Sequence, residues 1–258
     1  MGRIIAFVYG VVCYAIFFLT FLYLIGFVGN VAVPKGVDDG DVTAMPVALA
    51  INFALIALFG LQHSVMARSG FKQRLTRVLP ESMERSTFVL ATSLVLILLY
   101  WQWRPLPQAI WTVTDPVGAS VLWGLFALGF GLVLASTFVI DHFDLFGLRQ
   151  VWLNLLGRAY RHPPFKVTWF YRVVRHPIYL GLLLAFWSAP TMTLGRLAFA
   201  FGMSVYIMIG IGYEERDLVR FLGEDYRRYR ERVPALLPRP GRSHEVVRPS
   251  RTGAVAGR

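Results

Sequence analysis

The ionisable residues best placed to do chemistry stand at the ends of long stretches that lack charged side chains. Four clusters of this kind occur, at residues 62–64, 141–144, 171–177 and 213–217. They contain three of the five histidines of the chain, namely His63, His142 and His176. Histidine has a reference pKa of about 6.5 and therefore exchanges a proton near neutral pH. The clusters indicate a candidate site for acid–base chemistry at helix ends.

Three of the four clusters also have a purely structural explanation. A protonated His63 would suit the C-terminal end of its helix, where the helix dipole is negative. Asp141 and His142 could simply form the polar end of a membrane helix, and Glu214 and Glu215 could pair with neighbouring arginines. On the sequence alone both explanations stay open for all three clusters.

The sequence lacks the motifs of several other kinds of chemistry. There is no glycine-rich phosphate loop and no G-x-G-x-x-G motif after a predicted strand, so no soluble nucleotide-binding domain is expected. The single cysteine, Cys13, excludes an internal disulfide and a cysteine-built metal site. No two histidines stand four residues apart, so no helical metal-binding pair is present and no metal is expected.

The composition is that of a membrane protein. Of the 258 residues, 56% are apolar, aromatic or cysteine and only 16% are charged. Soluble domains have about 45–50% apolar residues, glycine included, and about 25% charged residues. The net charge of +11 would suit either nucleic acid or an anionic membrane surface. The long apolar runs indicate the membrane, and no nucleic-acid partner is expected.

Six stretches lack Asp, Glu, Lys and Arg and are predicted to be helices: residues 4–34, 42–67, 86–103, 116–140, 176–195 and 197–213. The first four have roughly the 20 residues that a helix needs to cross a bilayer. The fifth is interrupted by Pro190 and Gly195 and the sixth has only 17 residues, which favours a hairpin of short helices over one broken helix. The expected fold class is an all-α, polytopic membrane protein of about six hydrophobic helices.

The basic residues predict the orientation of these helices. Residues 68–85, 141–175 and 214–258 hold 22 of the 26 Lys and Arg residues, whereas residues 35–41 hold one lysine and three aspartates. In a six-helix layout the three basic segments lie on the same side, which the positive-inside rule identifies as the cytoplasm. Both termini are therefore predicted to be cytoplasmic.

Two basic segments also have the pattern of helices that lie on a membrane surface. Residues 148–160 and 216–232 each place apolar side chains on one face and arginines on the other. Such helices bind anionic lipid, so membrane lipid is an expected partner. The last segment, residues 238–258, has no periodicity and is predicted to be a disordered basic tail, which leaves residues 1–237 as one integral-membrane domain.

The C-terminal third of the chain carries a paired motif. Residues 175–181 read R-H-P-x-Y-x-G, residues 214–218 read E-E-R-D-L, and residues 221–229 read F-x-G-x-x-Y-x-x-Y. Together these stretches resemble the integral-membrane methyltransferases related to isoprenylcysteine carboxyl methyltransferase and to phospholipid methyltransferases. The resemblance implies that S-adenosylmethionine is the cofactor.

The same resemblance implies which residues bind the cofactor. Carried over by position, they are Arg175, His176, Pro177, Tyr179, Leu180, Gly181, Glu214 and Glu215. The glutamates would accept hydrogen bonds from the ribose hydroxyls or the ammonium group, and Arg175 would pair with the carboxylate of the cofactor. Gly181 would let the ligand approach the helix backbone.

The N-terminal half is similar to the methanethiol S-methyltransferases, membrane enzymes of bacteria that make dimethyl sulfide. The similarity is carried by residues 62–68, 84–88, 101–105 and 141–147. It implies methyl transfer to a small thiol, with methanethiol as the expected acceptor, in the inner membrane of a bacterium.

Methyl transfer to a thiol requires a base, because the thiolate is the reactive form. His142 and His63 are the candidate bases, and Asp141 or Asp144 is expected to orient His142. The alternatives are an enzyme that methylates a prenylcysteine carboxylate or a lipid amine, and a non-catalytic membrane accessory protein related to nitrite-reduction proteins.

Overall fold

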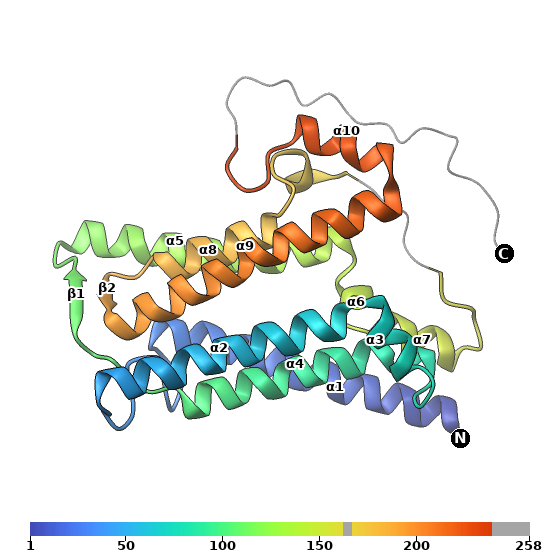
Figure 1. Cartoon of the computed structure of the whole chain (residues 1–258), viewed down its shortest axis with the longest axis horizontal. Coiled ribbons are helices and arrows are strands. Elements are labelled where there is room, and N and C mark those ends of the chain that lie inside the picture. The colour runs from blue at the N-terminus through green and yellow to red at the C-terminus, as the bar shows by residue number, and fades with distance from the viewer. Residues whose placement is uncertain (162–166, 239–258) are drawn as a thin grey trace.

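The computed structural model describes residues 1–161 and 167–238, and most of this part of the chain is helical (Figure 1). Within it, five helices are long and apolar enough to cross a membrane: α1 (Gly2–Gly29), α2 (Met45–Ala67), α4 (Glu81–Gln102), α5 (Pro116–Ile140) and α9 (Leu194–Leu222). A further apolar helix, α8 (Pro177–Trp187), is shorter. The predicted all-α polytopic membrane fold is confirmed.

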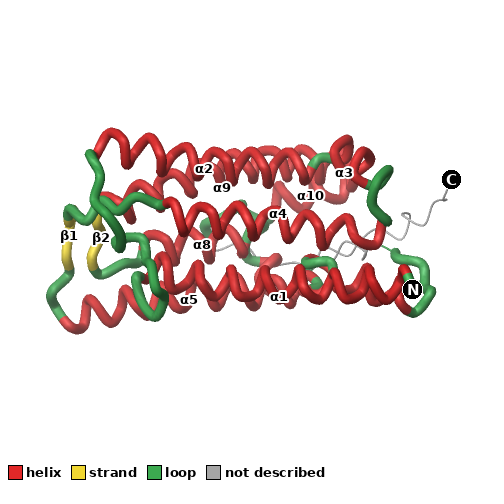
Figure 2. Tube along the Cα trace, turned by 90° about the horizontal axis from the view of Figure 1, so that it is seen from below, coloured by secondary structure: helices red, strands yellow, loops and turns green. Residues whose placement is uncertain are grey.

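Successive apolar helices run in opposite directions, so the bundle has two distinct ends (Figures 1 and 2). One end carries the N-terminus, the 3-10 turn η1 (Trp169–Arg172) and the short helices α3 (Ser69–Leu75), α6 (His142–Leu145), α7 (Leu148–Leu155) and α10 (Glu224–Arg232). At the other end β1 (Ala109–Thr112) pairs antiparallel with β2 (Thr191–Thr193), with Trp111 opposite Met192. We call these the helical end and the strand end.

Helices α8 and α9 form the expected hairpin, but only α8 is short. Helix α9 has 29 residues and includes Arg196, which the charge pattern treated as a boundary. Arg196 is accommodated because its Nε donates to Oδ2 of Asp38 at 2.8 Å and its Nη2 donates to the carbonyl of Gly29 at 3.2 Å. A charge removed from water needs such partners. The prediction that the last helix is short is therefore wrong.

The two predicted surface helices also differ from expectation. The helix predicted over residues 216–232 is divided at Gly223, whose φ of 59° favours glycine. The part before Gly223 belongs to α9 and the part after it forms α10. The helix predicted over residues 148–160 is the shorter α7, whose buried Val151 packs against Gly10 of α1. Apart from Pro238, the predicted disordered tail lies outside the described residues.

Helices α5 and α8 approach each other closely through two glycines. A Cβ atom added to Gly129 would lie 2.6 Å from the carbonyl oxygen of Gly181, and one added to Gly181 would lie 2.6 Å from the carbonyl oxygen of Gly129. Small residues let helix backbones approach each other in membranes. This contact fixes the position of α8, and of the residues that precede it, relative to α5.

Aromatic rings fill the core near the strand end. Phe27, Trp103 and Phe199 are buried and meet edge to face, with ring centroids 5.6 to 6.1 Å apart. The amide of Asn52 donates to the carbonyl of Arg104 at 2.8 Å and accepts from its N–H at 2.9 Å. These contacts hold α2 against the end of α4.

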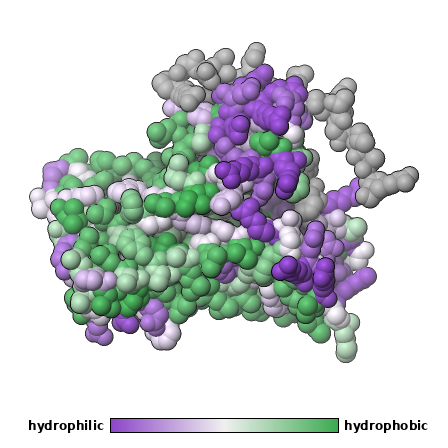
Figure 3. Space-filling model, in the orientation of Figure 1, coloured by the Kyte–Doolittle hydropathy of each residue, from purple (hydrophilic) through white to green (hydrophobic). Residues whose placement is uncertain are grey.

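The surface matches the helix assignment. Large apolar side chains are exposed along the long helices, as expected where a protein faces lipid tails. On the face seen in Figure 3, hydrophilic residues gather mainly over α10 and around α3, at the helical end. The candidate site residues lie at this same end.

Candidate active site

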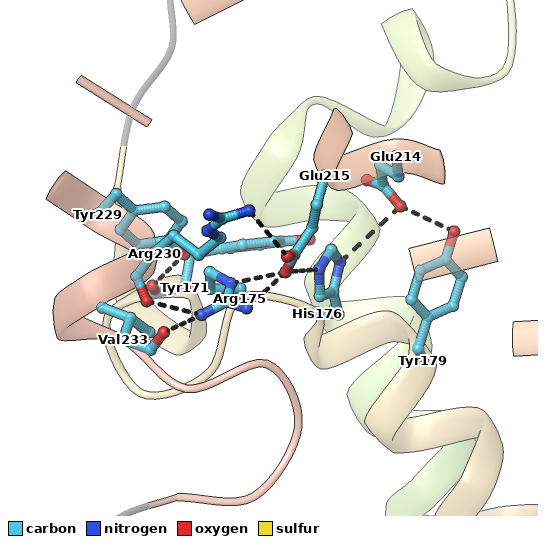
Figure 4. Close-up of polar contacts among 9 residues, drawn as sticks. All are labelled: Tyr171, Arg175, His176, Tyr179, Glu214, Glu215, Tyr229, Arg230 and Val233. Atoms are coloured by element: carbon cyan, nitrogen blue, oxygen red, sulfur yellow. Dashed lines mark hydrogen bonds and ion pairs between the residues drawn. The ribbon is translucent and has the colours of Figure 1, made fainter. Parts of the chain in front are cut away.

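The two parts of the paired motif meet at the helical end (Figure 4). Nε and Nη2 of Arg175 donate to Oε1 of Glu215 at 2.8 and 2.5 Å. Nε2 of His176 lies 3.1 Å from the same oxygen. The hydroxyl of Tyr179 donates to Oε2 of Glu214 at 2.9 Å. We call these five residues the α8–α9 network.

The local sequence explains this geometry. Pro177 is the first residue of α8, a position that suits its fixed φ and its missing N–H. His176 therefore lies just outside the helix and Tyr179 lies in its first turn. Glu214 and Glu215 follow each other on α9, so their side chains point about 100° apart around the helix axis. The carboxylate of Glu215 therefore reaches His176, and that of Glu214 reaches Tyr179.

Arg175 also holds the segment that follows α10. Its Nη1 donates to the carbonyl of Arg230 at 2.9 Å and to the carbonyl of Val233. Backbone hydrogen bonds of 2.9 and 3.1 Å join residues 175–176 to residues 234–235. The guanidinium thus has protein partners on two elements, and its expected pairing with a cofactor carboxylate remains a prediction.

The members of the network differ in exposure. The side chains of Arg175, His176 and Glu215 are largely buried, whereas that of Glu214 is 44% exposed. Nδ1 of His176 lies 3.8 Å from Oε2 of Glu214. Buried charges need to be paired, and the contact between Arg175 and Glu215 does this. Glu214 is the carboxylate with surface left for a ligand.

Tyrosines form the wall beside Glu215. Burial and the carboxylate of Glu215 raise the pKa of Tyr226 to about 12. Burial also raises the pKa of Tyr229, whose hydroxyl donates to the carbonyl of Tyr171 at 2.6 Å. Both phenols are therefore neutral at neutral pH, and they add no charge to the site.

Three further residues expected at the cofactor lie on α8. Pro177 and Gly181 are buried and Leu180 is half-buried. Gly181 packs against Gly129 of α5, so its lack of a side chain already serves helix packing. Contact between these residues and a cofactor remains a prediction.

His142 forms a second cluster, where α1 meets the end of α5. Its Nε2 lies 2.8 Å from the hydroxyl of Tyr14, and its Nδ1 lies 2.8 Å from Oγ1 of Thr137. The imidazole stacks on the ring of Phe138 with the centroids 4.2 Å apart. Burial lowers the pKa of His142 below its ordinary value, while the charge of Asp141 opposes this shift. A neutral imidazole is the form that accepts a proton.

Asp141 does not orient His142 in the structure. Its Oδ1 accepts from the backbone N–H of Asp144 at 3.1 Å, and its Oδ2 accepts from Nη1 of Arg149 at 3.0 Å. The carboxylate of Asp144 accepts from Tyr160 at 3.1 Å. Both carboxylates therefore organise α6 and α7, and the expectation that one of them positions the imidazole is corrected.

No sequence motif points to the two groups that do hold the imidazole, Tyr14 and Thr137. Both lie inside stretches without charged residues, in α1 and α5. The only available signal was that each is a polar side chain within an apolar helix, where polar groups often have a function. Many such residues occur in this chain, so the signal alone could not select these two.

His63 lies in a third cluster, on α2. The rings around it are those of Phe59, Phe88 and Tyr206. Its Nδ1 is 3.4 Å from Oγ1 of Thr92, which is a long hydrogen bond. Within residues 1–161 and 167–238, no hydrogen bond or ring contact joins His63 or His142 to the α8–α9 network. The assignment of His63 as a base remains a prediction.

A shallow hollow borders the His142 cluster. It is lined by Phe138, Val139 and Ile140 at the end of α5, and by Thr168 and Trp169 on the other side. Phe138 carries the stacked imidazole, and Trp169 begins the turn that leads into Arg175. The hollow therefore adjoins the His142 cluster and the segment that precedes Arg175 in the chain.

The described part of the chain shows no group of three or more His, Cys, Asp or Glu side chains placed to hold a metal ion. What it does contain is a paired arginine–histidine–glutamate network and a separate buried imidazole, both at one end of a bundle of apolar helices. The fold and these contacts together define an integral-membrane protein with a buried polar network at its helical end.

Comparison with known proteins narrows this class. A family model described as NnrU protein matches residues 52–211. A protein of Mycobacterium tuberculosis named methanethiol S-methyltransferase is 50% identical, over 94% of this chain and 99% of its own. Methanethiol S-methyltransferase 1 of Bradyrhizobium diazoefficiens is 51% identical, over 92% of this chain and 83% of its own. The chain therefore belongs to the NnrU protein family and to the family of relatives named methanethiol S-methyltransferase.

More distant relatives carry another name. Nurim of Xenopus laevis is 31% identical over 65% of this chain and 61% of its own, and Nurim of Bos taurus is 31% identical over 75% of each chain. No solved structure matches the chain.

Proposed function

We propose that this protein transfers a methyl group from S-adenosylmethionine to the sulfur of methanethiol and so makes dimethyl sulfide. Relatives with 44 to 51% identity over 92 to 94% of the chain are named for methyl transfer to this thiol. The structural observation that carries the proposal is the α8–α9 network, because it joins two motif segments that are far apart in the sequence into one polar site.

The residues of the network fit S-adenosylmethionine by their chemistry. The cofactor carries a sulfonium, an ammonium group and ribose hydroxyls, all of which are cations or hydrogen-bond donors. The exposed carboxylate of Glu214 accepts such groups, and the neighbouring ring of Tyr179 favours a cation over its face. When bound, the cofactor supplies an electrophilic methyl group.

The carboxylate of the cofactor also needs a cation. Arg175 is already bonded to Glu215 and to two backbone carbonyls. The half-exposed guanidinium of Arg230 lies 4.0 Å from Oε2 of Glu215 and has surface available. We therefore propose that Arg175 positions Glu215, and that Arg230 takes the role of pairing with the carboxylate of the cofactor that the sequence resemblance gave to Arg175.

The acceptor thiol must lose its proton before transfer, because the thiolate is the nucleophile. His142 is the candidate base that the structure supports best, since burial keeps its imidazole neutral. The apolar rings around it exclude water, which strengthens electrostatic interactions in the site. Methanethiol is small and apolar, so it reaches these rings through the lipid.

The proposed location is supported by the bacterial source of these relatives and by the charge distribution. We propose that the protein lies in the cytoplasmic membrane of a bacterium with its helical end in the cytoplasm. The basic segment 68–85 and the described residues of 141–175, namely 141–161 and 167–175, belong to that end, which suits the positive-inside rule. The charged cofactor would then enter from the cytosol and the thiol from the bilayer.

The proposal is tested by following the product in the gas phase. The purified full-length chain in detergent is given methanethiol and S-adenosylmethionine with a labelled methyl group. Labelled dimethyl sulfide above the solution is expected. A folded protein that forms none, or that methylates only a prenylated cysteine peptide or a lipid amine in parallel assays, contradicts it.

A second candidate is favoured by the match to the NnrU family and to Nurim, whose names state no methyl transfer. In that case the protein is a membrane accessory protein that has kept the fold without turnover. Calorimetry separates the two, because only the methyltransferase is expected to bind S-adenosylmethionine.

A further inference from the structure

The hydrogen bonds around His142 favour one tautomer of its ring. Oγ1 of Thr137 lies 2.7 Å from the carbonyl oxygen of Leu134, to which it can donate its single hydroxyl proton. With that proton so used, the 2.8 Å contact between Oγ1 and Nδ1 of His142 is a hydrogen bond only when Nδ1 is the donor. A neutral imidazole has one protonated nitrogen, so Nε2 of His142 is the bare one. Its partner, the hydroxyl of Tyr14 at 2.8 Å, must donate to it.

This arrangement places Tyr14 between the candidate base and any substrate. His142 is only 3% exposed, and both of its nitrogens are occupied by protein hydroxyls. A thiol therefore has no free nitrogen to approach. Tyr14 is half-buried, and it comes from a different helix than the imidazole.

The surroundings of Tyr14 suit a small apolar thiol that arrives from the lipid. The ring of Phe143 lies 6.3 Å from that of Tyr14, and the ring of Phe138 stacks on His142. Both phenylalanines are more than half exposed on the apolar surface. Phe138 also lines the shallow hollow, together with Trp169.

We propose that Tyr14 is a further catalytic residue, which takes the proton of the thiol and passes its own proton to Nε2 of His142. The proposal rests on the methyl transfer to a thiol proposed above. The S–H bond breaks and its proton bonds to the phenol oxygen, while the O–H proton of Tyr14 moves to Nε2. The thiolate that remains forms the new carbon–sulfur bond to the methyl group, and the electron pair of the broken bond stays on the sulfur of the donor. His142 later returns the proton through Tyr14 to water.

The charges around the imidazole are compatible with this relay. Asp141 and Asp144 are both paired with Arg149 of α7, at 3.0 and 3.6 Å, so neither is an unpaired carboxylate next to the ring. The titratable group that α1 places against the imidazole of His142 is Tyr14. Burial lowers the pKa of His142, which favours return of the proton after each turnover.

The kinetic test compares two tyrosines of the same helix. Tyr14→Phe keeps the ring and removes the hydroxyl, and it is expected to lower the rate of dimethyl sulfide formation by about 100-fold or more at neutral pH. The loss should shrink at high pH, where the thiol ionises in solution. Tyr9→Phe is the matched control, because Tyr9 also joins α1 to another helix, through a 2.9 Å hydrogen bond to Thr87. It should leave the rate within a few-fold.

Equal rates in the unaltered protein and Tyr14→Phe overturn the proposal, as does a loss that is the same at every pH. The latter result would make Tyr14 a structural contact between helices. Equal losses in both variants would overturn it as well, because any lost contact of α1 would then have the same effect.

Nitrogen-15 NMR of the ligand-free protein gives a test that needs no turnover. The resonances of His142 are identified by their loss in His142→Gln. We expect Nδ1 to carry the proton and Nε2 to be bare, and we expect Thr137→Val to allow the other tautomer. A proton on Nε2 in the unaltered protein overturns the relay even where a variant does not fold. If the expected tautomer is found but no dimethyl sulfide forms, the proposed function has failed and the relay has no thiol to act on.

Discussion

Glu214 and Glu215 are neighbours in the sequence, but their surroundings assign them different tasks. Glu215 is largely buried and accepts from Arg175 and His176, so it holds α9 to the start of α8. Glu214 is 44% exposed and is held by Tyr179 alone among the hydrogen bonds of the network. We therefore expect a ligand to meet Glu214 before Glu215.

Replacing Glu214 by glutamine is expected to weaken S-adenosylmethionine binding by about ten- to a hundred-fold. The reason is that a hydrogen bond to a charged group contributes about 1.5–3 kcal/mol. Calorimetry on the ligand-free protein in detergent measures the change. Glu224→Gln is the control, because Glu224 is an exposed residue of α10 that pairs with Arg227. An unchanged affinity in Glu214→Gln would remove this carboxylate from the cofactor site.

The pKa of His142 makes a prediction about pH. Because burial lowers this pKa, the imidazole stays neutral to a lower pH than a free histidine, whose pKa is about 6.5. The rate of dimethyl sulfide formation should therefore rise with pH and reach half of its maximum below that value. His142→Ala should lose this limb and lower the neutral-pH rate by about 10²–10⁴-fold. A half-maximal rate above about pH 6.5, which is the pKa of a free histidine, would contradict the assignment of His142 as the base.

At the scale of elements, the pairing of α5 with α8 controls the site, because α8 begins directly after His176. Gly129→Ala would bring a Cβ to 2.6 Å from the carbonyl oxygen of Gly181. Overpacking of this kind costs about 1–3 kcal/mol. We expect the free energy of unfolding in detergent to fall by that amount, together with S-adenosylmethionine affinity.

Gly131→Ala is the matched control on the same helix. A Cβ added there meets no atom within 4 Å, and alanine is the better helix former. Its stability should be equal to that of the unaltered protein or slightly higher. Equal effects of the two substitutions would mean that the α5–α8 contact is not tight.

The sequence predicted those elements whose cause is local. Helices α1, α2, α4 and α5 follow from stretches without charges. The paired motif selected the residues of the α8–α9 network, but it did not predict that they bond to one another across 35 to 40 residues. The start of α9 was misplaced because Arg196 is neutralised by Asp38, a partner 158 residues away. The contact between Tyr14 and His142, 128 residues apart, is invisible for the same reason. Partners brought together by tertiary packing leave no mark on local patterns.

At the scale of the whole molecule, polar contacts occupy both ends of the bundle but differ in character. The strand end is closed by the buried pair of Arg196 and Asp38, with Thr193 also bonded to that aspartate. The helical end carries the candidate site and the described parts of the basic segments. One end therefore serves stability, and we propose that the other receives the ligands.

This polarity predicts the topology. Reporter fusions after residues 78, 160 and 240 should all report a cytoplasmic location, and a fusion after residue 110 should report the opposite side. The physical reason is the positive-inside rule applied to the basic segments. A periplasmic signal after residue 160 would contradict the proposed orientation of the site.

The length of α8 has a consequence for the surrounding lipid. Its 11 residues span about 16 Å along the helix axis, whereas the hydrocarbon core of a bilayer is about 30 Å thick. The charged groups of Arg175 and Glu215 thus begin well below the level at which the longer helices end. Hydrophobic mismatch of this kind is met by local thinning of the bilayer and by inward displacement of headgroups and water. Bilayer thickness would then govern how closely a water-borne cofactor and a lipid-dissolved thiol can meet.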